Sequence, residues 1–224
     1  HREWREEIIY FLMVDRFHDS NKRSSLDFDV RHSGFGNEDE LQKPFGGTIK
    51  GIIDNIDYIK DLGCTALWLS PVFENNPKAY HGYAIQNYLD VDNRWGTKKD
   101  LERLVDKAHE LDIRVFLDVV LHHSGDNWSY PFDHEYYYLD GQRFPLGDWR
   151  ENDRPLPIEL RDPELYNRKG QIRNFDKYPE TQEGDFLTLK TFRNDGTPES
   201  EKLGELLAAI HCYWIRETDV DGFR

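Results

Sequence analysis

Apolar residues along this chain fall into short runs that alternate with amphipathic segments. The run Ile8–Val14 is continuously hydrophobic and of strand length, which is typical of a strand buried on both faces. Over residues 48–62 isoleucines recur at steps of three and four, with aspartates between them and Gly63 after them. This spacing predicts an amphipathic helix that ends at the glycine.

The alternation continues through a second strand and a second helix. Thr65–Ser70 is a second apolar strand, and apolar residues over 101–111 mark a helix whose start carries a capping-box signal at Thr97 and Asp100. A third strand, Ile113–Val120, follows this helix within two residues. The pattern therefore predicts two βαβ units that share a parallel sheet.

Periodicity disappears in the next part of the chain. Residues 122–195 are rich in Pro, Gly, Asp and Asn, and a loop of this length inside a domain is normally functional or a small domain of its own. A third helix face and the start of a fourth strand follow. We predict three strands with their helices over 1–121, an inserted subdomain over 122–195, and the third helix with the start of strand four over 196–224.

The predicted elements fit two α/β architectures. Four parallel strands could form the N-terminal half of a (β/α)8 barrel or part of a doubly wound sheet, and periodicity does not separate the two. No Gly-x-Gly-x-x-Gly follows any strand, which disfavours a dinucleotide-binding sheet. We therefore expect the half barrel, with an irregular insertion after its third strand.

Composition and charge narrow the choice of partners. A formal net charge of −14 leaves no basic stripe for phosphates, which argues against nucleic acid and anionic membrane surfaces and favours an uncharged ligand. Two cysteines in apolar elements make a disulfide framework improbable. The chain has no charged-then-apolar leader and no long apolar run, so we expect a soluble protein, cytoplasmic or exported with its signal removed, in an unknown oligomeric state.

Polar residues gather where the predicted strands end, which is where barrels place their ligand sites. Asp118 and the pair His122 and His123 follow the third strand, and Arg224 ends the fourth. Asp118 could equally cap a buried turn or pair with a nearby arginine. A zinc site built from the histidines, with His81, lacks a supporting H-x-x-x-H helix or cysteine pair.

Four stretches, in their order and spacing, resemble the α-amylase family, glycoside hydrolase family 13. They are the Asp-Arg-Phe ending of the first strand, Tyr80–Tyr83 followed by Trp95–Thr97, Asp118–His123, and Asp221–Arg224. The resemblance covers nearly the whole chain. It implies a (β/α)8 barrel of which this chain is the N-terminal half, with the insertion as the family's domain B.

The resemblance also implies an activity on α-glucans or malto-oligosaccharides. The family works with retention, through a carboxylate nucleophile and an acid/base carboxyl about 5 Å apart. Its nucleophilic Asp lies two residues beyond the arginine matched by Arg224, and its other carboxylates come from later strands. Residues 1–224 are therefore expected to hold only the supporting half of the site and to be inactive alone.

The supporting residues carry over position by position. The resemblance implies that Tyr83 stacks on the sugar, that His81 lines its pocket and that His123 donates a hydrogen bond to one of its hydroxyls. Arg224 would keep the nucleophile ionised, and Asp118 would brace Arg224.

At the positions of the family's usual calcium site, this chain departs from the family's pattern. The site's asparagine and aspartate are replaced by His122 and Thr191. An imidazole is a poor calcium ligand, so we expect no calcium at that site and no other cofactor. A different site near Asp19, Asn21 and Asp27 reads more readily as a polar turn.

Two other functions stay open. The chain could belong to a non-catalytic amylase-like protein that binds carbohydrate or assembles with a partner, or to an unrelated α/β enzyme that uses Asp118 and His123 as an acid-base pair. Only the last predicts activity in residues 1–224 alone.

Overall fold

The computed structural model describes residues 3–20, 44–77, 79–132, 136–138 and 142–224. Its main sheet has four parallel strands in the order β1-β2-β5-β8, aligned so that Phe11, Trp68, Phe116 and Gly222 lie side by side. The strands are β1 (Ile9–Leu12), β2 (Ala66–Leu69), β5 (Arg114–Leu117) and β8 (Gly222–Phe223).

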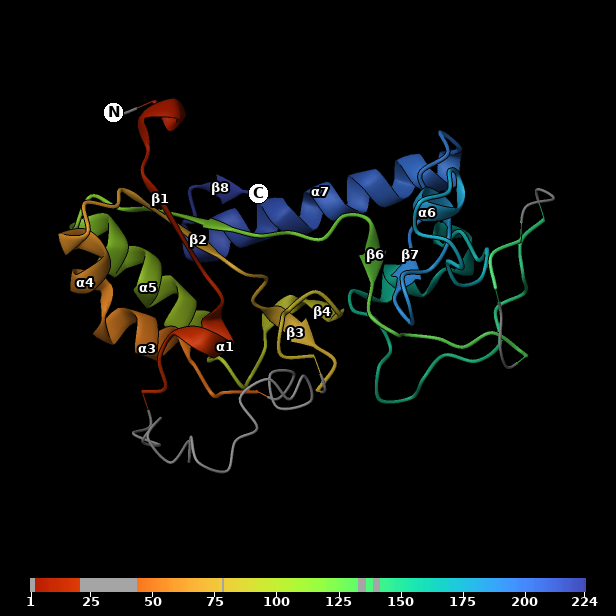
Figure 1. Cartoon of the computed structure of the whole chain (residues 1–224), viewed down its shortest axis with the longest axis horizontal. Coiled ribbons are helices and arrows are strands. Elements are labelled where there is room, and N and C mark those ends of the chain that lie inside the picture. Colours follow the sequence, from red (N-terminus) through yellow and green to blue (C-terminus); the bar gives the residue numbers. More distant parts are fainter. Residues whose placement is uncertain (1–2, 21–43, 78, 133–135, 139–141) are drawn as a thin grey trace.

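Helices cover one face of this sheet. Leu67, Leu69, Val115 and Leu117 are fully buried and belong to one core with the apolar faces of the helices. Figure 1 shows α3, α4 and α5 together on one side, while α7 runs from the far end of the molecule back to the sheet. The helices are α1 (Val14–Phe17), α3 (Ile49–Asp54), α4 (Ile56–Asp61), α5 (Lys98–Glu110) and α7 (Pro198–Thr218).

Several predicted elements differ in their bounds, among them the third strand, which ends at Leu117 and not at Val120. The helix expected over 48–62 divides into α3 and α4 at Asn55, whose φ of −123° and ψ of 16° leave the helical region and whose side chain donates to the Gly51 carbonyl. The first strand ends at Leu12 rather than at Val14, because the chain turns into α1 there. The capping box at Thr97 and Asp100 is confirmed.

A hairpin between β2 and α5 was not predicted. Strand β3 (Phe73–Asn75) pairs antiparallel with β4 (Ile85–Val91), and the loop between them carries Tyr80–Tyr83. Ile85, Leu89 and Val91 share the two-residue spacing of a strand, but Asn87 interrupts it, so the signal for β4 was weak. The hairpin places the loop beside the carboxyl ends of the main strands.

The segment between β5 and α7 is mostly irregular and lies at the far end of the molecule from α3, α4 and α5 (Figure 1). Trp128, Leu160, Tyr166 and Phe192 are buried within it. Its elements are β6 (His123–Ser124), which pairs antiparallel with β7 (Lys190–Thr191), and the short helices η3 (Ile158–Arg161), η4 (Pro163–Leu165) and α6 (Glu180–Glu183). The boundary of the insertion at residue 195 stays a prediction.

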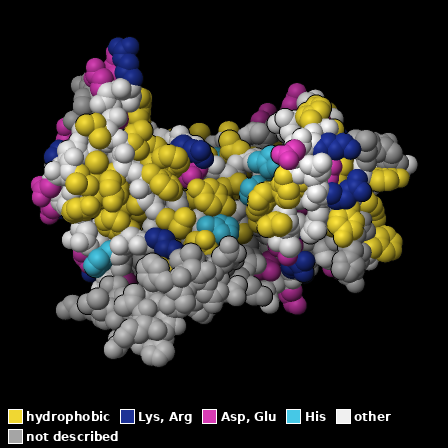
Figure 2. Space-filling model, viewed as in Figure 1, with side chains coloured by type: hydrophobic (Ala, Val, Ile, Leu, Met, Phe, Trp, Pro, Cys, Tyr) yellow, Lys and Arg dark blue, Asp and Glu magenta, His cyan; other side chains and the backbone are white. Residues whose placement is uncertain are grey.

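The other face of the sheet is apolar and is partly exposed at β1. Ile9 and Phe11 are 51% and 46% exposed, and Phe11, Trp68 and Phe116 form a row of ring contacts that Trp4, in η1 (Trp4–Glu6), extends. Figure 2 shows hydrophobic side chains gathered over this part of the molecule. None of the helices in the described ranges is long and apolar enough to cross a membrane.

Candidate functional site

Asp118 lies at the centre of a cluster at the carboxyl end of the sheet. It follows β5, its amide donates to the Leu69 carbonyl, and its carboxylate is 1% exposed. One oxygen accepts from the Tyr83 hydroxyl at 2.7 Å and the other from Arg224 Nη1 at 3.3 Å. Both carboxylate oxygens therefore have a partner, as a buried charge requires.

Arg224 reaches this carboxylate from the end of the neighbouring strand. Its backbone bonds to Leu117 and Val119, and its guanidinium lies 4.8 Å from the centre of the Trp68 ring. The side chain is 60% exposed, so the ion pair with Asp118 adds little to stability. Its effect is to fix the direction of the guanidinium, because a planar fork between a carboxylate and a ring has few alternative positions.

His81 and Tyr83 come from the loop of the β3–β4 hairpin. The Tyr83 amide donates to His81 Nδ1 at 3.0 Å, and the two rings are stacked with their centroids 5.9 Å apart. Because Nδ1 accepts, the neutral imidazole carries its proton on Nε2. Burial, and then the charge of Arg94, lower the pKa of His81, which favours this neutral form.

His123 closes the cluster from the start of the insertion. Its Nε2 lies 3.1 Å from the Tyr83 carbonyl, so this nitrogen carries the proton and donates. Burial, and then the neighbouring His122, lower the pKa of His123 to about 4. Burial, followed by the hydrogen bond to Asp118, raises the pKa of Tyr83 to about 12. Two imidazoles and a phenol are therefore neutral at neutral pH.

We call His81, Tyr83, Asp118, His123 and Arg224 the five-residue cluster. The structure brings all five predicted residues together, and within the cluster Asp118 is the single carboxylate. Neutral hydrogen-bonding groups beside an aromatic ring suit a ligand with many hydroxyls and no charge. The pairing of Asp118 and His123 as acid and base has no support, because Asp118 bonds to Tyr83 and Arg224 instead.

The two positions compared with a calcium site have hydrogen-bond partners within the chain. His122 Nε2 lies 3.2 Å from the Gln182 carbonyl, and the Thr191 hydroxyl donates to the Gly184 carbonyl at 2.8 Å. Over the described residues, no group of three or more His, Cys, Asp and Glu side chains could hold a metal ion. Asn21 and Asp27 of the alternative site lie outside the described residues.

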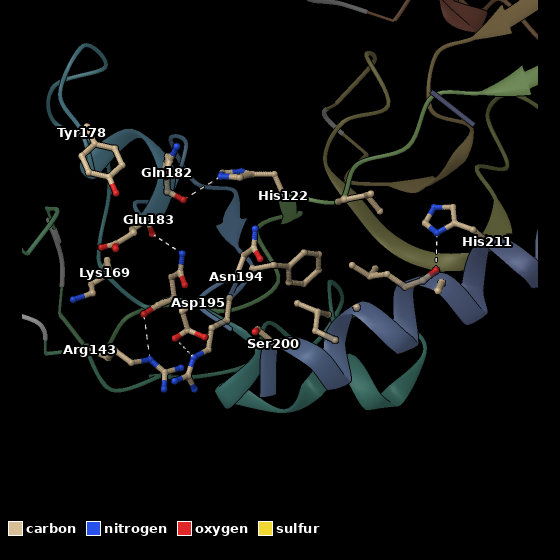
Figure 3. A pocket seen from close by; sticks show the side chains of 18 residues that line it. His122, Arg143, Lys169, Tyr178, Gln182, Glu183, Asn194, Asp195, Ser200 and His211 are labelled. Atoms are coloured by element: carbon tan, nitrogen blue, oxygen red, sulfur yellow. Dashed lines mark hydrogen bonds and ion pairs between the residues drawn. The ribbon is translucent and has the colours of Figure 1, made fainter. Parts of the chain in front are cut away.

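A groove of about 1060 Å³ begins beside the cluster at His122. One wall belongs to α7, with Leu207 and His211, and the other to the insertion, with Gln182 and Glu183 (Figure 3). The sequence analysis missed this groove, because its walls come from segments with no common motif. Positively and negatively charged side chains line the groove together with apolar ones.

Known proteins similar to this chain are named α-amylases and cyclomaltodextrinases. Alpha-amylase 2 of Dictyoglomus thermophilum is 40% identical over 222 residues, which are 99% of this chain and 32% of that protein. A cyclomaltodextrinase of Geobacillus thermopakistaniensis is 30% identical over 225 residues, 99% of this chain and 34% of that protein. The solved structure of an α-amylase from Geobacillus thermoleovorans, complexed with acarbose, is 32% identical with a TM-score of 0.69, and the match covers 100% of this chain and 40% of that one.

A parallel sheet with its polar cluster at the carboxyl strand ends, and an irregular segment after the third strand, defines part of a (β/α)8 barrel. Residues 11–224 match the family model of the α-amylase catalytic domain, and the chain belongs to this family. Its four strands are the N-terminal half of the family's barrel, and the chain spans about a third of the two curated relatives.

Proposed function

We propose that the complete protein carrying this chain is a retaining glycoside hydrolase that acts on α-glucans or malto-oligosaccharides. The observation that carries the proposal is the convergence of Tyr83, Asp118 and Arg224 from three separate elements of an α-amylase-family chain. The names of the relatives, which include α-amylases and cyclomaltodextrinases, support this substrate class.

Each residue of the five-residue cluster has a proposed part in holding the sugar. Tyr83 offers a ring whose hydroxyl is fixed by Asp118, and His81 offers a protonated Nε2. His123 donates to the Tyr83 carbonyl, so a sugar hydroxyl at this point would compete for that proton. Arg224 stabilises the ionised form of a nucleophilic carboxylate expected two residues further along the complete protein.

A non-catalytic amylase-like binding or assembly protein is the second candidate. The observation in its favour is that the cluster holds one carboxylate, which already bonds to Tyr83 and Arg224, whereas retention needs two free ones. The two candidates differ in the residues that follow Arg224. An aspartate two positions on, with later carboxylates, favours the hydrolase.

The test is cleavage of malto-oligosaccharides by the complete protein, with the anomeric form of the product followed by NMR. We expect α-configured products, and a loss of roughly 100-fold in kcat/KM for Tyr83→Ala, since the sugar then loses its platform. Tyr58→Ala, on the exposed face of α4, is the control and should leave kcat/KM unchanged. Binding without cleavage by the wild-type protein would contradict the hydrolase and favour the second candidate.

We further propose that the insertion does without calcium because Lys190 supplies the cation. The Lys190 ammonium, 5% exposed, lies 3.3 Å from Asp126 Oδ1 and 3.9 Å from Asp185 Oδ2. Asp185 also accepts from the Tyr130 hydroxyl and the Thr191 amide. Burial raises the pKa of Asp185 to about 6, against the effect of Lys190, so the carboxylate is ionised at neutral pH. A second cation at this point would be repelled.

A further inference from the structure

The loop that carries His81 and Tyr83 is held by a buried side chain outside the five-residue cluster. Asn75, at the end of β3, is 3% exposed, and its Nδ2 donates to the Gly82 carbonyl at 2.8 Å. Its Oδ1 accepts from the Ala84 amide at 2.7 Å. These two groups belong to the peptide units on either side of Tyr83. One buried amide therefore fixes the backbone on both sides of the ring.

Asp92 and Arg94 hold the first part of the same loop. Asp92, 2% exposed, accepts from the Asn75 amide at 3.0 Å and from Arg94 Nε and Nη2 at 2.8 and 2.6 Å. The guanidinium also donates to the carbonyls of Pro77 at 2.9 Å and Ala79 at 3.1 Å. A planar fork that bonds a carboxylate and several carbonyls restrains the loop in more than one direction.

The backbone at Gly82 has little freedom to take another path. Its φ of +89° is a backbone angle that residues with a side chain rarely adopt. A Cβ there would lie 2.3 Å from the Pro71 carbonyl oxygen. The loop thus packs closely against the end of β2. Its position is set by the hairpin and by β2, and not by Asp118 alone.

We propose that Asn75 is the positioning residue for Tyr83, and that Asp92 and Arg94 hold the loop so that the Tyr83 hydroxyl meets Asp118. The hydroxyl bond of 2.7 Å is lost if the backbone of Tyr83 moves by about 1 Å, because hydrogen bonds weaken steeply with distance and angle. The proposal rests on the proposed function only for its effect on catalysis; the positioning itself is a property of the chain.

The test compares the ionisation of Tyr83 in the wild-type chain and in Asn75→Ala. Tyrosines carry ¹³C at Cζ for NMR, and Tyr83→Phe identifies the signal. At about pH 11, a pKa of about 12 leaves about a tenth of Tyr83 ionised, whereas an ordinary pKa of about 10 gives about nine tenths. We expect the ionised fraction to rise several-fold in Asn75→Ala, because the ring leaves Asp118 and its partly buried position.

Asn87→Ala is the matched control, since Asn87 lies on the same hairpin but bonds to Glu74 and not to the loop. It should leave the Tyr83 signal unchanged. Arg94→Lys keeps the positive charge but loses the planar guanidinium that bonds Asp92 and the loop carbonyls. Because Arg94 is only partly buried, this variant replaces Asn75→Ala in the test if Asn75→Ala does not fold. A folded Asn75→Ala or Arg94→Lys chain with the wild-type ionised fraction, and with the wild-type Cζ shift at neutral pH, would overturn the proposal.

In the complete protein, Asn75→Ala should lower kcat/KM on malto-oligosaccharides by at least about 10-fold, with most of the loss in kcat. Asn87→Ala should not. If the wild-type protein cleaves no α-glucan, the proposed function fails, while the Tyr83 measurement still decides whether Asn75 positions the ring.

Discussion

His123 makes the stability of this chain depend on pH in a defined direction. Its pKa is about 4 in the folded chain and about 6.5 when unfolded, so between these values the unfolded chain binds a proton that the folded chain does not. The stabilisation is therefore full above about pH 6.5 and is lost as the pH falls towards 4. The loss should be about 3 kcal/mol. Urea unfolding at a series of pH values measures it.

His123→Gln removes this titration while its amide can still donate to the Tyr83 carbonyl. The free energy of unfolding of this variant should fall less steeply between pH 6.5 and pH 4 than that of the wild type. His18→Gln, at an exposed position, is the control. Equal slopes for wild type and His123→Gln would show that His123 does not carry the dependence.

The residues of the five-residue cluster could be predicted because each stands in one of the short stretches that resemble the family's motifs. Asn75 and Arg94 could not, although they lie close to the same site. Both act by bonding to backbone carbonyls and amides, and such bonds need a matching loop path and leave no pattern along the sequence. Their partners become visible only once the hairpin is in place.

At the scale of elements, the helices and strands with a regular apolar pattern could be predicted, and those without such a pattern were missed. Helix α5 has a clear 3.6-residue apolar face and a capping box, and its bounds agree with the prediction. The break at Asn55 went unseen because the apolar spacing continues across it. Strands β6 and β7 are two residues long, and side-chain bonds hold much of the insertion. Strands this short contain too few residues for a periodic apolar pattern to be recognised in the sequence.

Strand β7, which pairs with β6, carries Lys190 and its ion pairs with Asp126 and Asp185. These ion pairs allow a test of the proposal that the insertion does without calcium. We expect neither EDTA nor added calcium to shift the thermal midpoint of the wild-type chain. Lys190→Met should cost about 3 kcal/mol, because it leaves the buried Asp185 without its cation. Differential scanning calorimetry measures both effects.

The double variant Lys190→Met with Asp185→Asn is the control for this experiment. It removes both charges, so it should be more stable than Lys190→Met alone. A rise in the wild-type midpoint with calcium that EDTA reverses would contradict the proposal and restore a metal to the insertion.

Among the described residues, one face of the main sheet stays partly exposed at β1. The strand order β1-β2-β5-β8 makes β1 and β8 open edges, and the side chains of β1 that point away from the helices are half exposed. Ile9 and Phe11 lie there, and the Phe11 ring contacts the Trp68 ring with centroids 4.5 Å apart. In a closed barrel this face would be the interior. Residues 1–224 alone therefore present both an apolar surface and unpaired strand edges.

We expect the 224-residue chain on its own to associate through this face. Light scattering after size exclusion should give an average mass above that of one chain, rising with protein concentration. Phe11→Gln should move the mass towards the single chain, because it removes a large, half-exposed apolar group from the β1 end of the row of rings. Ile158→Gln, at a residue that is 64% exposed but lies on the insertion, should not. A wild-type chain that stays monomeric as its concentration rises would show that the open sheet does not drive association.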